Sequence, residues 1–185
     1  MCSSDLCHSG ASGANAMRTK TGDDVSPVGT WQATMMANSF RDPYFRAQMQ
    51  KETASQGEAV QELCLRCHAP MAHQQALKDG KDAPRLGEIK LSPLAEDGVS
   101  CTMCHQILPD GLGTETTFSG RPKIGSERKI FGPYEDPATG PMQNALRYTP
   151  TQGMHMRESS LCATCHTLVT EHQGKAFPEQ TPYLE

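Results

Sequence analysis

Three short segments of this 185-residue chain place two cysteines and a histidine in the same fixed order, C-x-x-C-H. They read CLRCH, CTMCH and CATCH. On a helical turn, positions i, i+3 and i+4 share one face, so each segment directs two thiols and an imidazole to the same side. Such a set can bond to the two vinyl groups of one haem and place a histidine nitrogen under its iron. The pattern predicts c-type haem attachment through Cys64, Cys67, Cys101, Cys104, Cys162 and Cys165, with His68, His105 and His166 as iron ligands.

Other uses of paired cysteines explain less of this pattern. A disulfide framework would suit the even count of eight cysteines, but it gives no reason for a histidine after each C-x-x-C pair. Structural zinc takes C-x-x-C pairs two at a time, so three pairs leave one pair over. A thioredoxin-like redox pair does not explain the histidines either, and no βαβ pattern surrounds the pairs. Haem attachment is therefore the preferred interpretation.

The N-terminal segment Ser4-Asp5-Leu6-Cys7-His8 carries part of a fourth motif, with serine where the first cysteine belongs. Two explanations stay open. Cys2 and Cys7 could form a stretched C-x4-C-H site, or residues 1–6 are not native and Cys7 is the surviving half of an ordinary motif. We favour the second. In both, a fourth haem is expected at Cys7, with His8 as its iron ligand.

The histidines outside the motifs are candidates for the opposite side of the iron. A haem that only transfers electrons needs six iron ligands, because a filled sixth site excludes water and dioxygen. His73, His155 and His172 each lie near a haem motif in sequence and are predicted to be distal ligands, the alternative for each being a solvated surface histidine. Among ten methionines, most of which must fill the core, we single out Met36 as a further ligand.

The composition indicates that side chains alone do not fill the core. Only 36% of the residues are hydrophobic and 5% aromatic, whereas Gly and Pro are abundant, at 16 and 13 residues. We therefore expect a single multihaem domain over residues 1–185, mainly α with extensive coil, in which short helices and irregular loops pack around haems with little or no sheet. The net charge of −4 excludes the basic footprint of a nucleic-acid binder. No apolar run is long enough to cross a membrane.

Local signals place the elements that must position these motifs. A loop is expected over residues 9–26 and an irregular segment over 106–155, both from their polar and Gly/Pro-rich composition. The predicted helices are Val28–Met36, a helix capped by Asp42 that opens at Pro43 and runs to about Lys51, Glu58–His68 stopped by Pro70, and Leu161–His166 capped by Ser159 or Ser160.

Several longer segments resemble the multihaem c-type cytochromes typified by the tetrahaem electron carrier of ammonia-oxidising bacteria. The similarity rests on the helix from Trp31 to Met36, the segments RDPYFRA, CLRCHAPMA and LCATCHTL, and the C-terminal FPEQTPYLE. The resemblance implies an electron carrier with covalently bound haem. Where the pattern would carry a distal histidine, this chain has Met36, so the resemblance implies methionine, a displaced histidine or an open site there.

Function and location follow as expectations. We expect an extracytoplasmic protein, periplasmic or extracellular, that relays electrons to redox partner proteins through about four closely spaced haems, and a sequence truncated at both ends. One alternative is a reductase, or part of one, acting on a small nitrogen or sulfur oxyanion through one five-coordinate haem. Another is a subunit of a conducting haem filament or other oligomer. Nucleic acid is not an expected partner.

Overall fold

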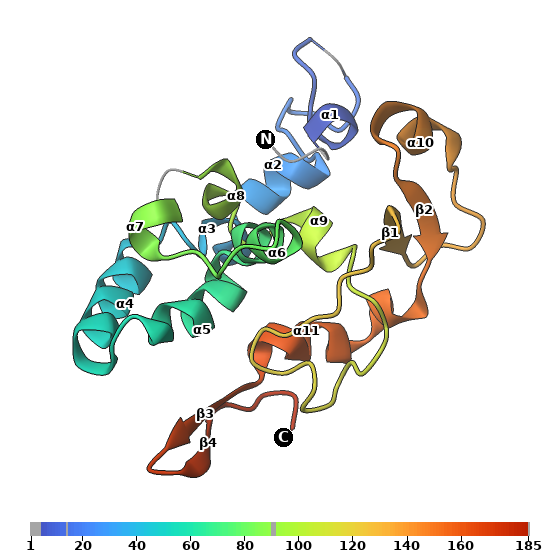
Figure 1. Ribbon diagram of the computed structural model, residues 1–185. Coiled ribbons are helices and arrows are strands. Elements are labelled where there is room, and N and C mark those ends of the chain that lie inside the picture. Colours follow the sequence, from blue (N-terminus) through green and yellow to red (C-terminus); the bar gives the residue numbers. More distant parts are fainter. Residues whose placement is uncertain (1–4, 14, 90–91, 185) are drawn as a thin grey trace. The chain divides into compact units, whose positions relative to one another are not determined.

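The computed structural model describes residues 5–13, 15–89 and 92–184, which form short helices joined by long stretches of coil (Figure 1). The helices are α1 (Asp5–His8), α2 (Pro27–Gln32), α3 (Met35–Asn38), α4 (Pro43–Gln56), α5 (Ala59–His68), α6 (Pro70–Lys78), α7 (Leu86–Ile89), α8 (Pro93–Glu96), α9 (Cys101–Cys104), α10 (Gly140–Leu146), α11 (Ser159–His166) and the 3-10 helix η1 (Met154–Arg157). The mainly α class with extensive coil is confirmed.

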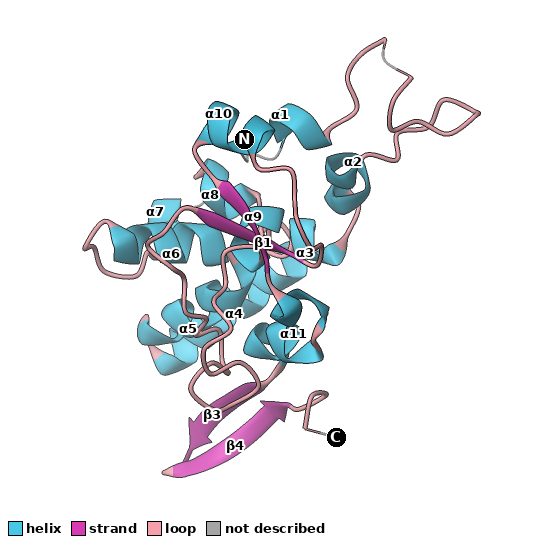
Figure 2. Cartoon of the chain, turned by 90° about the vertical axis from the view of Figure 1, so that its right-hand side faces the viewer, coloured by secondary structure: helices cyan, strands magenta, loops and turns pink. Residues whose placement is uncertain are grey.

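Two small two-stranded sheets accompany the helices (Figure 2). The first pairs β1 (Lys129–Gly132) with β2 (Thr149–Gln152) in parallel, and the second pairs β3 (Leu168–His172) with β4 (Lys175–Gln180) as an antiparallel hairpin. The hairpin turns through Gln173 and Gly174, which both have positive φ, as a type I′ turn requires. Sheet content is thus small but real.

The chain divides into two compact units, residues 1–102 and 103–185, with the boundary inside α9. The expectation of one domain over residues 1–185 stays a prediction. The predicted loop over 9–26 contains no helix and no strand among its described residues. The Cys2 alternative lies outside the described residues.

Hydroxyl and carboxylate caps set the helix starts in the first unit. The helix expected over Val28–Met36 is two helices, because Thr34 caps α3 by accepting from the Ala37 N–H at 3.2 Å. Asp42 accepts from the Tyr44 N–H at 2.9 Å and so opens α4 with Pro43 in its first turn, as predicted. This helix continues to Gln56, beyond the expected end.

Pro70 marks the start of a new helix as well as the end of the preceding one. Helix α5 ends at His68 as expected, but Pro70 then begins α6, a helix that the sequence analysis missed. Proline is well suited to a first helical turn, where its missing N–H would have no helical partner. The result is that α5, which carries a haem motif, is followed at once by α6, which carries His73.

The core of the first unit is built from α4, α5, α6 and α8. Its buried members are Phe40, Met49, Leu65, Ala69, Ala72 and Ala95, and the partly buried Phe45, Cys64, Leu86 and Leu94 pack against them. Leu65 lies inside the CLRCH segment and is fully buried. One side of α5 therefore packs in the core, and the residues on its other side are not needed for core packing.

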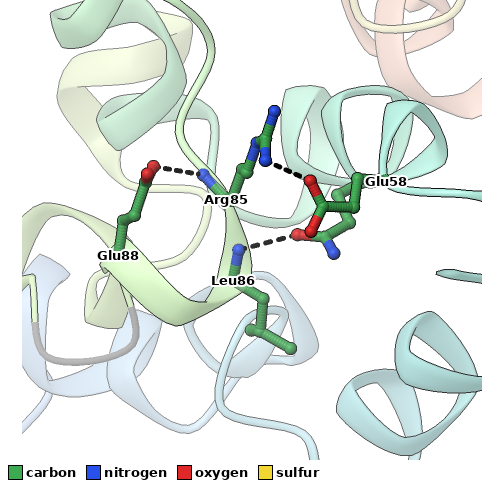
Figure 3. Close-up of polar contacts among 5 residues, drawn as sticks. Glu58, Arg85, Leu86 and Glu88 are labelled. Carbon is green, nitrogen blue, oxygen red and sulfur yellow. Dashed lines mark hydrogen bonds and ion pairs between the residues drawn. The ribbon is translucent and has the colours of Figure 1, made fainter.

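Helix α7 and the chain before it are tied back to α5 by polar contacts (Figure 3). The Arg85 side chain pairs with Glu58, and the Leu86 N–H donates to Gln61 Oε1 at 2.8 Å. The Arg85 N–H donates to Glu88 Oε2 at 3.0 Å, which fixes the first turn of α7. These contacts hold α5 at the end opposite to its haem motif.

The second unit contains more regular structure than expected. The segment 106–155 was predicted to be irregular, but it includes β1, α10 and β2, because α10 provides the connection that parallel pairing of two strands requires. The expected Ser159 or Ser160 cap is wrong. Helix α11 already begins at Ser159, its N-cap is Glu158, and within the described chain that position has no side-chain cap bond.

Candidate functional site

Each C-x-x-C-H segment lies at a helix end. Helices α5 and α11 terminate at the motif histidine, and α9 spans the two cysteines of the middle motif with His105 directly after it. Helical geometry brings i, i+3 and i+4 to one face, so in α5 and α11 the helix itself is expected to direct two sulfurs and one imidazole to the same side. In the middle motif only the two cysteines lie within the helix.

The His68 imidazole is held by Ser39 and Phe45. Its Nδ1 lies 3.0 Å from the Ser39 carbonyl oxygen, to which it donates, and the Ser39 hydroxyl donates to the His68 carbonyl at 2.9 Å. The Phe45 ring stacks on the imidazole with centroids 3.7 Å apart and planes 1° from parallel. A donating Nδ1 fixes the tautomer and leaves Nε2 as the metal-binding nitrogen.

Partial burial favours the neutral form of this imidazole. It lowers the pKa of His68, against the opposing effects of the Ser39 carbonyl and the Asp42 carboxylate. Neutral imidazole is the form that binds iron. The site is therefore prepared for a metal by the polypeptide itself.

The middle motif is held in the same way by a different part of the chain. His105 Nδ1 donates to the Phe131 carbonyl oxygen at 2.5 Å, and the Phe131 N–H donates to the His105 carbonyl at 2.7 Å. Strand β1 thus fixes His105 through both backbone groups of Phe131, because its carbonyl holds the imidazole and its N–H holds the His105 backbone. Again Nε2 is left for a metal.

In the last motif, the first cysteine and the histidine are more exposed to solvent than in the other two complete motifs. Helix α11 buries Leu161, Ala163 and Thr164, whereas Cys162 and His166 are exposed. His166 Nδ1 lies 3.5 Å from Gln180 Nε2, at the limit of a hydrogen bond. The buried face of this helix is fixed by the backbone of residues 119–120, whose N–H groups donate to Thr167 O at 2.9 Å and Thr164 O at 2.8 Å.

The partial N-terminal motif lies on α1, with Cys7 and His8 both exposed. These two residues are neighbours on a single helical turn. Nothing in the described residues adds a second cysteine to this site.

His73 is the most buried of the candidate distal ligands. Its side chain is 4% exposed, and among the described residues neither ring nitrogen has a hydrogen-bond partner. The nearest polar contact joins its Nε2 to Glu62 Oε1 at 3.8 Å, and burial lowers the pKa of His73. Glu62 itself is held by Arg66, whose hydrogen bond lowers the pKa of that carboxyl group. Buried polar atoms usually have hydrogen-bond partners, so the His73 ring nitrogens are candidates for a ligand contact.

The other distal candidates differ in their surroundings. His155 is half-buried, with Nε2 donating to the Ile107 carbonyl at 2.9 Å and its ring meeting the Phe131 ring edge-on at 5.0 Å. Phe131 therefore contacts both His105 and His155. His172 is exposed at the end of β3, and the Met36 side chain is 49% exposed on α3.

A polar hollow of about 660 Å³ lies beside α5 and α7, and among the described residues its lining contains none of the motif cysteines or histidines. It is lined by Glu58, Glu62, Lys81, Asp82, Arg85 and Glu88 together with neighbouring small residues. Its charged walls do not suit the large apolar face of a porphyrin. The chemistry of the chain lies at the motif helices instead.

The motif residues fit covalently bound haem. Two motif imidazoles donate from Nδ1 to backbone carbonyls and so present Nε2, and the buried atoms without partners in the described chain include His73, Thr164 Oγ1 and Thr167 Oγ1, all on or beside motif helices. No three His, Cys, Asp or Glu side chains of the described residues gather into a site for a bare metal ion. Ser39 and Phe131 are not predictable from the sequence, because a backbone carbonyl acceptor carries no side-chain signal.

A comparison with known protein families identifies the family of this chain. Residues 7–106 match the family model described as cytochrome c554 and c-prime, over more than half of the chain, and this range includes Cys7 and His8 of the partial motif and two complete motifs. No curated protein and no solved structure matches the chain significantly. Within the described residues, no helix has the length and apolar character to span a membrane. This chain belongs to the cytochrome c554 and c-prime family and is a c-type cytochrome, an electron carrier with covalently bound haem.

Proposed function

We propose that this cytochrome is an extracytoplasmic carrier that relays electrons between redox partner proteins through four haems. Each complete C-x-x-C-H motif would attach one haem, and Cys7 with His8 would attach the fourth. When bound, these groups supply reversible one-electron chemistry. The periplasmic or extracellular location is part of the proposal, because covalent haem attachment of this kind takes place outside the cytoplasm.

One observation carries this proposal. The imidazoles of His68 and His105 are each oriented by an Nδ1 donation to a backbone carbonyl, which directs Nε2 away from the backbone for an iron. The two acceptors, Ser39 and Phe131, come from distant parts of the sequence, and each accepts a hydrogen bond from the Nδ1 of a motif histidine. This donation raises the basicity of the ligating nitrogen, which is how a protein adjusts the reduction potential of a bound metal.

We propose His73, His155, His172 and Met36 as the distal ligands. His73 is supported by its burial and by the lack of any hydrogen-bond partner for its ring among the described residues. His155 contacts Phe131, the residue that also holds His105, and its ligation through Nε2 requires that the Nε2 donation to the Ile107 carbonyl be broken. A filled sixth position keeps water and substrates from the iron, as electron transfer alone requires.

Electron paramagnetic resonance of the oxidised holoprotein tests the carrier function. We expect only low-spin ferric signals, unchanged by nitrite, sulfite or hydroxylamine, and a haemochrome assay that counts four haems per chain. A high-spin signal that responds to one of these small molecules would contradict the proposal and favour a reductase.

A further inference from the structure

The short stretch from Met36 to Ser39, at the end of α3, contacts the histidine of one haem motif and the residue two positions before another. We call these residues the 36–39 turn. They belong to neither motif. Their contacts with the first motif are the two bonds between Ser39 and His68: the ring Nδ1 donates to the Ser39 carbonyl at 3.0 Å, and the Ser39 hydroxyl donates to the His68 carbonyl at 2.9 Å.

The same turn holds the chain that leads into the second motif. The Val99 N–H donates to the Met36 carbonyl at 2.9 Å, and the indole N–H of Trp31 donates to the Val99 carbonyl at 2.9 Å. Val99 lies two residues before Cys101. Both backbone groups of this residue are therefore bound by the α2–α3 region.

Gly98 allows the two segments to approach this closely. A Cβ atom at this position would lie 2.5 Å from the Met36 carbonyl oxygen, 2.8 Å from the Ala37 carbonyl oxygen and 2.8 Å from Ser39 Oγ. Its φ of +55° also disfavours any residue with a side chain. Two of the three obstructing atoms belong to the backbone, so any side chain at position 98 must displace the turn.

We propose that the 36–39 turn, seated on Gly98, is the positioning element for the His68 imidazole and sets the reduction potential of the haem at Cys64 and Cys67. Ser39 is its positioning residue. The carbonyl of Ser39 determines how strongly Nδ1 is hydrogen-bonded, the hydroxyl fixes that carbonyl against the motif backbone, and Phe45 prevents the ring from rotating away. A weaker bond from Nδ1 makes the imidazole a poorer donor to ferric iron, which raises the potential.

This inference rests on the proposed attachment of haem at Cys64 and Cys67. It goes further because it assigns control of that haem to residues outside every motif. It also places part of that control, Gly98, in the chain before the next motif, 30 positions after His68.

The test is a potentiometric titration of the holoprotein carrying Gly98→Ala or Ser39→Ala. We expect both variants to raise the midpoint potential of the haem at Cys64 and Cys67, and we expect Ser39→Ala to leave the potentials of the other haems unchanged. That haem is assigned by nuclear Overhauser contacts between the Phe45 ring and the hyperfine-shifted ring protons of His68. Ser39→Thr, which keeps the hydroxyl, should restore the wild-type potential.

Gly80→Ala is the matched control. Gly80 has a comparable φ of +67°, but no described heavy atom lies within 4 Å of a Cβ built there, so this variant pays the same backbone strain without displacing the 36–39 turn. Its potentials should equal those of the wild type. If Gly98→Ala does not accumulate, the comparison of Ser39→Ala with Ser39→Thr decides.

Two kinds of failure are distinguishable. If wild-type holoprotein carries no haem on the Cys64–Cys67 peptide by mass spectrometry, the proposed function fails. If that haem is present but its potential is the same in wild type, Gly98→Ala and Ser39→Ala, the positioning role is overturned while the attachment site stands.

Discussion

The first complete haem motif and the last are prepared to different extents. At His68 the imidazole is half-buried, an aromatic ring stacks on it, and its Nδ1 donates to the Ser39 carbonyl oxygen 3.0 Å away. At His166 the imidazole is exposed and its nearest polar contact is 3.5 Å away. The comparison teaches that the same five-residue motif can lie in different surroundings, and that these surroundings decide how firmly its histidine is held.

Removing the thiols has the largest expected effect, and it compares both sites directly. Cys64→Ala with Cys67→Ala, and separately Cys162→Ala with Cys165→Ala, should each lower the intact mass of the holoprotein by one haem. The first pair should also lower the unfolding temperature more, because Cys64 packs against the core of the first unit whereas Cys162 is exposed. Equal haem content in wild type and variants would contradict the attachment sites.

Loss of His73 should produce the next largest change, in this case spectroscopic. His73→Gln removes an imidazole that is 4% exposed, so we expect one low-spin ferric signal to be replaced by a high-spin signal. Gln75→Ala, on an exposed position of the same helix, is the control and should leave the spectrum unchanged. A spectrum of His73→Gln identical to that of the wild type would remove His73 from the distal ligands.

Truncating a side chain should lower the free energy of unfolding much more on the core-facing side of α5 than in the β3–β4 hairpin that follows the last motif. Leu65→Ala should cost about 2–5 kcal/mol of unfolding free energy, because it leaves a cavity under the CLRCH segment. Phe177→Ala, on strand β4, removes a side chain that is 50% exposed and meets only the edge of the His172 ring, so it should cost less than about 1 kcal/mol. Denaturant unfolding of the holoproteins measures both. A similar loss of unfolding free energy in the two variants would mean that Leu65 does not contribute to core packing.

The smallest effect is expected from ion pairs. Glu96→Gln removes the partner of Arg46, 3.3 Å away and about one-third exposed, and should cost no more than about 1 kcal/mol. Glu127→Gln removes a fully exposed partner of Lys129 and should have no measurable effect. The same unfolding measurement would contradict this order if the exposed pair contributed more than the partly buried one.

The sequence was sufficient for features that depend on local side-chain chemistry. The helix ends at His68 and His166, the Asp42 cap and the mainly α class all follow from short-range patterns, and the structure confirms them. Pro70 was misjudged because proline both ends and begins helices, and only the chain after it decides which. The break at Thr34 was missed for a related reason, since a threonine that caps one helix can also read as the interior of a longer one.

The contacts that hold the motif imidazoles could not be read from residue types. Ser39 and Phe131 act through backbone carbonyls, and every residue has a carbonyl, so only the fold reveals which one faces a histidine. Gly98 is similar, because its importance comes from atoms of a segment about sixty positions away in sequence. The β3–β4 hairpin was missed because its Gln173–Gly174 turn lacks the strongest hairpin dipeptides.

The central claim is that the C-x-x-C-H segments hold haem through paired thioether bonds. Mass spectrometry of peptides from the digested holoprotein tests it most directly. We expect the peptides that contain Cys64–Cys67, Cys101–Cys104 and Cys162–Cys165 each to carry the mass of one haem. Peptides at these positions that carry unmodified thiols or disulfides would contradict the account.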